Sequence, residues 1–150
     1  FANSSSISDG AAALVICSQK YADKNNLKTK AKIKGYAGHA HEPGWFTTAP
    51  IPAAKKLLES INWSIEEVDL WEVNEAFAVV PMAFMRELKI SREKINVNGG
   101  ACSLGHPIGA SGARILVSLI NALKQRDLKK GVAAICIGGG EALAIAIEVD

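Results

Sequence analysis

The run Val132-Ala133-Ala134-Ile135-Cys136-Ile137 passes through Gly138-Gly139-Gly140 directly into a second run, Glu141–Val149. The first run is apolar throughout, as expected of a strand buried on both faces. In the second run, large apolar residues alternate with alanines, and this period of two predicts another strand. Because only three glycines join the two strands, they must be antiparallel. The chain therefore predicts a sheet whose last strand runs against its neighbours.

Upstream, apolar runs alternate with helical patterns. Ala11–Cys17 is predicted to be a strand buried on both faces, Lys30–Tyr36 a half-exposed strand and Leu70–Val73 a third. Alternation of strands and helices favours a sheet covered on both sides. We therefore expect an α/β fold with three layers, α/β/α, around a mixed five-stranded sheet. Helical spacing of apolar residues is seen in three sets: Ala54, Leu57, Leu58 and Ile61; Phe77, Val80, Phe84 and Leu88; and Ala113, Leu116, Val117, Ile120 and Leu123.

Composition and charge exclude several classes of protein. The 150 residues fit one domain. With 17 basic and 15 acidic residues the net charge is only +2, which gives no case for nucleic-acid binding. No apolar run approaches the roughly 20 residues that span a bilayer, so we expect no membrane insertion. Three widely spaced cysteines suit neither a disulfide framework nor a metal site. A reducing compartment follows, either the cytoplasm or an organelle matrix.

Two polar stretches carry potential chemistry. Asn74-Glu75-Ala76-Phe77 comes where a strand ends and a helix begins, and ligands of open α/β sheets gather at the carboxyl ends of strands. The alternative is that Asn74 only caps the helix. Gly99–Gly112 is a glycine-rich loop in which backbone can approach a ligand closely. Its single histidine, His106, lies between Gly105 and Pro107, and the alternative there is a tight turn with a capping histidine.

The third stretch is Cys136 followed by the glycine turn. A cysteine at the end of a buried strand is usually an inert small apolar residue. Here the turn exposes backbone N–H groups beside the sulfur, which suits an oxyanion hole. Together, Asn74, His106 and Cys136 could remove a proton beside a thioester carbonyl and stabilise the enolate. We expect the three side chains to converge on one cleft, with His106 and the turn stabilising the Cys136 thiolate.

These stretches are similar to the three C-terminal signatures of the thiolase family, in the family's order and at intervals like the family's. They are Asn74–Phe77, the run Gly105–Arg114 and Cys136–Gly140. Asn3-Ser4-Ser5, followed by Ser8–Ala13, resembles the segment that opens the family's C-terminal domain. The resemblance covers essentially residues 1–150. One departure is Cys102-Ser103, where many members carry two apolar residues.

The resemblance implies an acyltransferase that condenses two acetyl-CoA molecules to acetoacetyl-CoA, or cleaves 3-ketoacyl-CoA with free CoA. By that analogy His106 activates a nucleophilic cysteine and Cys136 is the acid/base. Asn74 would hold a water of the first oxyanion hole, and the N–H of Gly138 would serve the second. Phe77 would line the acyl pocket. Coenzyme A enters as substrate, and no cofactor or metal is expected.

The same resemblance implies that residues 1–150 are the C-terminal domain of a longer enzyme. The nucleophilic cysteine belongs to the family's N-terminal half, and none of Cys17, Cys102 and Cys136 lies in that motif. A chain that opens Phe-Ala-Asn reads as part of something longer. We therefore expect the N-terminal half and acyl-CoA or CoA as partners, a homodimer or homotetramer, and no thiolase turnover from these residues alone.

Two other interpretations remain open. A ketoacyl synthase would usually show two such histidines and no Cys-Gly-Gly-Gly, so Cys136 argues against it. A non-catalytic thiolase-like domain that binds acyl-CoA or lipid, or that pairs with a separate subunit, often loses one signature residue, whereas this chain keeps all three of its half. His39 and His41 are interpreted as exposed loop histidines, because a metal needs more ligands than that loop offers.

Overall fold

A four-stranded sheet lies at the centre of the computed structural model, which describes residues 2–150. Its strands are β1 (Lys32–Ala40), β2 (Leu70–Val73), β3 (Lys130–Cys136) and β4 (Glu141–Glu148), in the spatial order β1-β4-β3-β2. β2 runs parallel to β3, whereas β4 is antiparallel to both β3 and β1. The predicted mixed sheet with an antiparallel last strand is confirmed.

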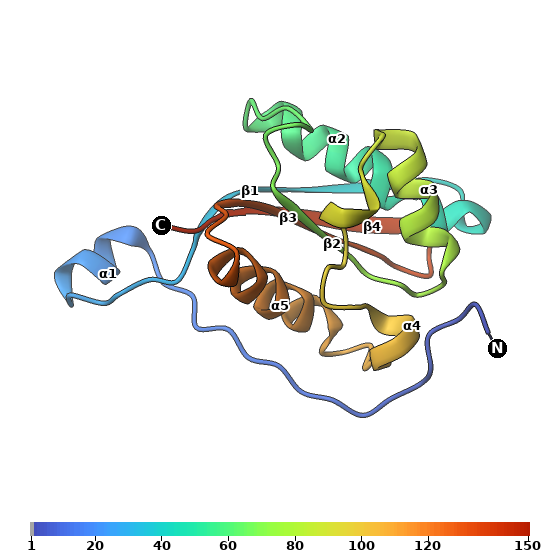
Figure 1. Ribbon diagram of the computed structural model, residues 1–150, viewed down its shortest axis with the longest axis horizontal. Coiled ribbons are helices and arrows are strands. Elements are labelled where there is room, and N and C mark those ends of the chain that lie inside the picture. The colour runs from blue at the N-terminus through green and yellow to red at the C-terminus, as the bar shows by residue number, and fades with distance from the viewer. Residues whose placement is uncertain (1) are drawn as a thin grey trace.

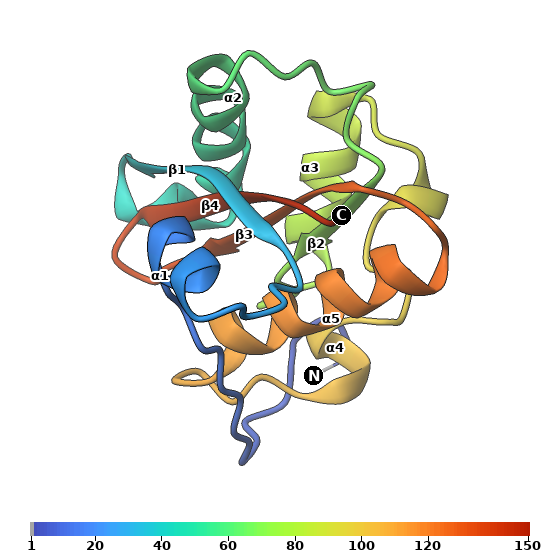
Figure 2. The same cartoon turned by 90° about the vertical axis from the view of Figure 1, so that its left-hand side faces the viewer.

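Helices cover both faces of the sheet, which confirms the three layers (Figure 1, Figure 2). α2 (Pro50–Ser60) and α3 (Val79–Leu88) lie on one face and α5 (Ser111–Gln125) on the other. Pro50 suits the first turn of α2, where its missing N–H has no intrahelical partner. The remaining elements are short: α1 (Gln19–Lys24), the 3₁₀ helices η1 (Pro43–Thr48) and η2 (Arg92–Lys94), and α4 (Ala101–Leu104).

Each face of the sheet has its own core. Leu57 of α2, Trp71 of β2 and Phe84 of α3 are fully buried in one core, where the centroids of the Trp71 and Phe84 rings lie 5.4 Å apart in an edge-to-face arrangement. Leu119 and Leu123 of α5 fill the other core. Burying each such side chain stabilises the fold by about 1.5–3 kcal/mol. These two cores fix the position of α5 relative to the end of β2. The positions of the polar residues of the candidate site follow from this.

The sheet has four strands instead of the expected five, because Ala11–Cys17 is not a buried strand. Within residues 2–150 it pairs with no strand, and its Val15 side chain is fully exposed. An apolar run predicts burial but does not name the surface that buries it, so the prediction was wrong for this part of the chain. A fifth extended position occurs instead at Ile95, which forms a single parallel bridge to Trp71 beside β2.

One charged side chain lies inside this apolar architecture. All four residues of β2 are buried, and Glu72 among them is only 2% exposed. Burial raises the pKa of the Glu72 carboxyl from its ordinary 4.5 to about 7, although the nearby Arg114 cation opposes the rise and Glu75 adds to it. At neutral pH the folded chain therefore holds Glu72 close to the midpoint of its ionisation.

This burial predicts a pH-dependent stability. Between about pH 4.5 and 7 the folded state keeps a proton on Glu72 that the unfolded state releases, so the free energy of unfolding falls as pH rises through that window. Each pH unit of difference is worth about 1.4 kcal/mol, which makes the loss up to about 3 kcal/mol by pH 8. Glu72→Gln keeps the neutral shape and should remove this loss, as measured by urea unfolding at pH 5 and pH 8.

Exposed Glu59 provides the control. Glu59→Gln should keep the wild-type dependence on pH. If Glu72→Gln and the wild type lost the same free energy between the two pH values, Glu72 would not be the buried group that titrates.

Candidate active site

The end of β2 and the glycine-rich loop meet at one place. Asn74 directly follows β2, and its N–H donates to the carbonyl of Ala134 at 2.9 Å, which continues the pairing with β3. Its side chain is 1% exposed. The loop from Gly99 is less irregular than expected, because it contains the short helix α4 before it reaches His106. Asn74 and His106, 32 residues apart in sequence, are thereby brought into contact.

Both ring nitrogens of His106 are held by side chains. Nδ1 lies 2.6 Å from the hydroxyl of Ser111, and Nε2 lies 3.3 Å from the amide nitrogen of Asn74. The Ser111 hydroxyl has one hydrogen and donates it to the carbonyl of Pro107 at 3.0 Å. It must therefore accept from His106, which places the proton on Nδ1. Nε2 is then the basic nitrogen, and the Asn74 amide donates to it.

The electrostatic surroundings keep His106 neutral. Burial lowers the pKa of its imidazole, and the positive charge of Arg114 lowers it further. A neutral imidazole with an unprotonated nitrogen can accept a proton once the Asn74 amide gives up its hydrogen bond to that nitrogen, which is what a general base needs. The site is therefore prepared to receive a proton at Nε2.

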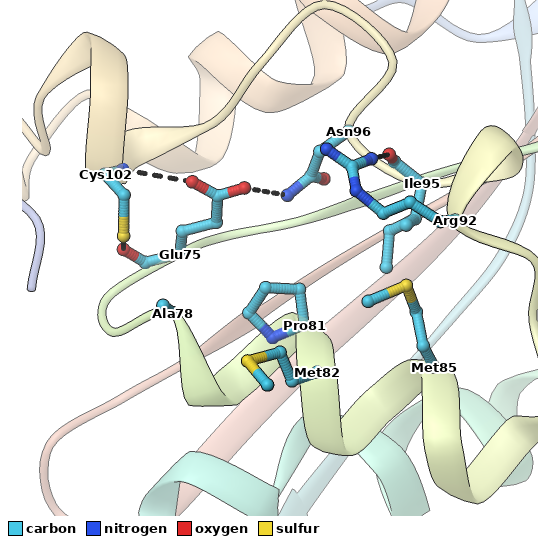
Figure 3. A pocket seen from close by; sticks show the side chains of 9 residues that line it. All are labelled: Glu75, Ala78, Pro81, Met82, Met85, Arg92, Ile95, Asn96 and Cys102. Atoms are coloured by element: carbon cyan, nitrogen blue, oxygen red, sulfur yellow. Dashed lines mark hydrogen bonds between the residues drawn. The ribbon is translucent and has the colours of Figure 1, made fainter. Parts of the chain in front are cut away.

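A single carboxylate fastens the two loops together. Glu75, the residue after Asn74, accepts from the side-chain amide of Asn96 at 2.8 Å and from the backbone N–H of Cys102 at 3.0 Å (Figure 3). Asn96 in turn bonds both backbone groups of Val73 in β2. A side chain at Gly100 would overlap the Glu75 carboxyl group and would displace it from its hydrogen bonds to Asn96 and Cys102. Glu75 thus sets where the histidine loop lies relative to β2.

The N-terminal segment runs alongside both loops. The N–H of Ser5 donates to the carbonyl of Ala76 at 3.1 Å, and the N–H of His106 donates to the carbonyl of Ser6 at 3.0 Å. Gly105 has φ of +94°, a left-handed conformation that favours glycine, and a Cβ there would overlap Ser8. The backbone of His106 is therefore fixed from two sides.

Cys136 ends β3 at the start of the glycine turn. It is buried among the residues beneath α2 and α3, and burial raises the pKa of its thiol. The expected stabilisation of its thiolate is therefore not produced by this chain alone. Within residues 2–150 no hydrogen bond joins Cys136 to Asn74 or His106, and its convergence with them stays a prediction.

The glycine turn leaves backbone donors available. Gly140 has φ of +105°, and a Cβ there would overlap the carbonyl of His41. Across residues 2–150, the N–H of Gly138 donates to no protein acceptor, and the space around its Cα is open. This N–H is free to meet a negatively charged oxygen, which is what an oxyanion hole requires.

The other predicted residues lie at the edges of this region. Phe77 is 39% exposed and meets Phe46 edge to face at 6.1 Å. His41 Nε2 lies 2.7 Å from the carbonyl of Trp45. In the part of the chain that the structure describes, no three His, Cys, Asp or Glu side chains are grouped as metal ligands. No helix of residues 2–150 is long and apolar enough to cross a membrane.

Two cavities flank the site, and neither contains it. One of about 180 Å³ lies between Glu75, Met82 and Cys102, and one of about 400 Å³ lies between Asp9 and Ile108. Neither is lined by Asn74, His106 or Cys136.

The sequence reasoning gave no role to Ser111, Glu75, Asn96 or the Ser5–Ser6 segment, although Ser111 and Glu75 lie within the signature stretches and Ser5 within the opening segment. Ser111 could have been found, because it follows His106 by five residues at a helix start. The partners of Glu75 are 21 and 27 residues away, and no local pattern indicates them.

Residues 27–149 match the protein family described as the thiolase C-terminal domain. An acetyl-CoA acetyltransferase from Arabidopsis thaliana is 53% identical over 98% of this chain. A mouse relative named as cytosolic acetyl-CoA acetyltransferase is 46% identical over 98% of the chain. The chain spans only 36% and 37% of these two proteins.

Solved structures agree with the sequence relatives. The crystal structure of the Bacillus anthracis acetyl-CoA acetyltransferase superposes with a TM-score of 0.96 at 47% identity, covering 99% of this chain and 38% of that one. A human mitochondrial 3-ketoacyl-CoA thiolase in complex with CoA superposes with a TM-score of 0.86 at 40% identity, covering 89% of this chain and 34% of that one.

The role of Glu75 can be tested by removing one acceptor. In Glu75→Gln the amide nitrogen would face either Asn96 or the Cys102 N–H, both of which are donors. One partly buried hydrogen bond is lost, and we expect the free energy of unfolding to fall by about 1–3 kcal/mol. Hydrogen exchange of the Cys102 amide should also accelerate. Exposed Glu66 supplies the control, since Glu66→Gln should change neither quantity. Unchanged exchange at Cys102 in Glu75→Gln would show that the carboxylate does not hold the loop.

Proposed function

The chain belongs to the thiolase family, and from that premise we propose that it supplies one half of an active site that condenses or cleaves coenzyme A thioesters. The reaction would be Claisen condensation of acetyl-CoA to acetoacetyl-CoA, or the reverse cleavage of a 3-ketoacyl-CoA. The contact between Asn74 and His106 carries the proposal, because it joins two of the family's signature residues around a basic nitrogen. Coenzyme A is the group held by the related human enzyme.

His106 is the proposed base for a nucleophilic cysteine. Its Nε2 is unprotonated and hydrogen-bonded only to Asn74, and the lowered pKa of the ring keeps it neutral at physiological pH. It would take the thiol proton as the cysteine attacks the thioester carbonyl, and with that proton donate a hydrogen bond toward the thioester oxygen. When the bond to the CoA sulfur breaks, the proton would pass to the departing CoA thiolate and leave the acyl group on the cysteine. We propose that this nucleophilic cysteine comes from the N-terminal half of the enzyme, outside residues 1–150.

Oxyanion stabilisation is the proposed role of two further groups. Asn74 Oδ1 is buried and accepts no hydrogen bond from residues 2–150, so it can accept one from a water whose other hydrogen points to the thioester oxygen. The free N–H of Gly138 would stabilise the second oxyanion. Phe77, half-exposed at the edge of the site, would contact the acyl chain.

Cys136 is the proposed acid/base for the carbon beside the carbonyl. Because burial raises the pKa of its thiol, the resting group is protonated, which suits donation to the carbanion formed on cleavage. In the direction of condensation its thiolate needs a positive or hydrogen-bonding neighbour from outside residues 2–150. Completion by the rest of the enzyme is therefore part of this mechanism.

Exposed apolar side chains on this chain support the proposal that another part of the enzyme covers it. The exposed apolar side chains of residues 7–16, and those of Tyr36 and Leu143 on the sheet, are surfaces that a further part of the polypeptide would cover. We propose the N-terminal half as that partner, assembly as a homodimer or homotetramer, and location in the cytoplasm or an organelle matrix. Residues 1–150 alone are expected to show no turnover.

The mechanism separates two half-reactions, and Cys136→Ala in the native polypeptide tests it. Acylation of the nucleophile by acetyl-CoA should persist, whereas condensation should fall by about 10²–10⁴, the usual contribution of a positioned acid/base. Exchange of the acetyl methyl hydrogens with solvent should disappear. His106→Ala should lose both half-reactions. Mass spectrometry of the acyl-enzyme and proton NMR of the methyl group provide the two measurements.

Cys102→Ala is the matched control, because Cys102 is a second half-buried thiol, whose side chain donates only to the carbonyl of Glu75 at 3.7 Å and to neither Asn74 nor His106. It should keep both half-reactions. If Cys136→Ala exchanged the methyl hydrogens at the wild-type rate, Cys136 would be a packing residue and the role proposed for it would be wrong.

A further inference from the structure

His106 is suspended between two elements of the fold. Its Nε2 is bound by Asn74, which follows β2, and its Nδ1 by Ser111, which opens α5. The direction of the imidazole therefore depends on the distance between the end of β2 and the first turn of α5. Any interaction that joins these two elements directly also controls the ring.

A buried charge pair makes that connection. Glu72 lies two residues before Asn74, so both side chains point to the same side of the strand. Arg114 lies three residues after Ser111, so both share one face of the helix. Glu72 Oε2 and Arg114 Nη1 are 3.9 Å apart. The pair thus links the same two elements as His106 does, two residues earlier along the strand and three residues later along the helix.

The pair is poorly explained as a stabilising feature. Glu72 Oε1 and Arg114 Nη1 are both buried and have no hydrogen-bond partner within residues 2–150. A buried ion pair with incomplete hydrogen bonding is often no more stable than apolar side chains of the same volume. The pair joins the same two elements that hold His106, which suits a role in placing the ring better than a role in stability.

We propose that Glu72 and Arg114 are positioning residues for His106, which hold the first turn of α5 against the end of β2 and place a controlled charge beside the imidazole. This inference rests on the proposed base role of His106. Arg114 does not touch the ring in this structure and acts through Ser111 and through its charge.

The charge balance follows from the groups that face the pair. Arg114 comes from α5, Glu75 from the residues after β2, and His106 from the loop between them. Below about pH 7 Glu72 is mostly protonated, and the Arg114 cation then acts on His106 without compensation. The imidazole therefore stays neutral to a lower pH than it otherwise would. Above pH 7 the Glu72 carboxylate partly cancels the cation.

Nitrogen-15 NMR of the histidine rings in the native polypeptide tests the proposal, with the His106 signals identified by their loss in His106→Asn. Arg114→Met removes the charge at similar length, and we expect the pKa of His106 to rise toward its ordinary value. The signals should also change from the single Nδ1–H tautomer to a mixture. Arg114→Lys keeps a cation there and should preserve the lowered pKa.

Arg126→Met is the matched control, because Arg126 lies at the other end of α5 and bonds Ala122 and Asn98. It should leave both properties of His106 unchanged. If Arg114→Met lowered stability but moved neither the pKa nor the tautomer of His106, the pair would be structural only, and the proposal would be overturned.

Glu72→Gln supplies a second test that does not depend on Arg114. In the wild type, the nitrogen signals of the neutral His106 ring should shift a second time near pH 7, as Glu72 ionises. Glu72→Gln should lack this second shift. Its persistence in the variant, or its absence in the wild type, would contradict the proposal. Neither readout involves a thioester, so failure here is separate from failure of the proposed reaction.

Discussion

The arrangement of the site depends on one constraint, namely that the His106 imidazole is bound at both nitrogens by residues from different elements. A hydrogen bond from Asn74 or from Ser111 alone would restrain only one nitrogen of the ring. With both in place, the tautomer and the direction of the basic nitrogen are fixed together. This arrangement requires that β2 and α5 keep fixed positions relative to each other. The parallel pairing of β2 with β3 and the packing of α5 against these two strands fix those positions.

The glycine-rich loop follows from the same constraint. To carry His106 beneath the end of β2, the chain must pass close to Glu75 at Gly100 and close to Ser8 at Gly105, and neither position has room for a Cβ. The Glu75 carboxylate then attaches the loop to the end of β2 by accepting hydrogen bonds from the Asn96 side chain and the Cys102 N–H. Glu75, Asn96 and the two glycines, which look unrelated in the sequence, therefore act together to hold the His106 loop against the end of β2.

What could be predicted from the sequence was local. The final hairpin follows from two apolar runs and three glycines, and the helix after Pro50 follows from its apolar spacing. The prediction that Ala11–Cys17 forms a buried strand was wrong, because an apolar run predicts burial without specifying which surface buries it. Asn74 and His106 were found through their motifs, whereas the partners of Glu75 and the Glu72–Arg114 pair were not. The contacts that were missed join residues 21 to 42 positions apart; they are set by tertiary packing, and no period or spacing in one sequence encodes them. The contact of Asn74 with His106 spans 32 positions and was expected only because both residues belong to the signature motifs.

The buried polar atoms show where stability has been given up. Native proteins pair nearly all such atoms. Among residues 2–150, side-chain atoms without a partner occur at Trp71, Glu72, Asn74 and Arg114, and three of these four belong to the polar residues around His106. Each is a donor, an acceptor or a charge that the fold has desolvated and left free, at a cost of about 1–3 kcal/mol. A preorganised site needs such groups, because only a donor or acceptor not already satisfied by the protein can strengthen its bond as charge develops on a reacting atom. Of these atoms only Asn74 Oδ1 belongs to a residue that contacts His106, so it is the one suited to bond a group near a reacting atom, whereas the free atoms of Glu72 and Arg114 belong to the pair proposed to position the ring.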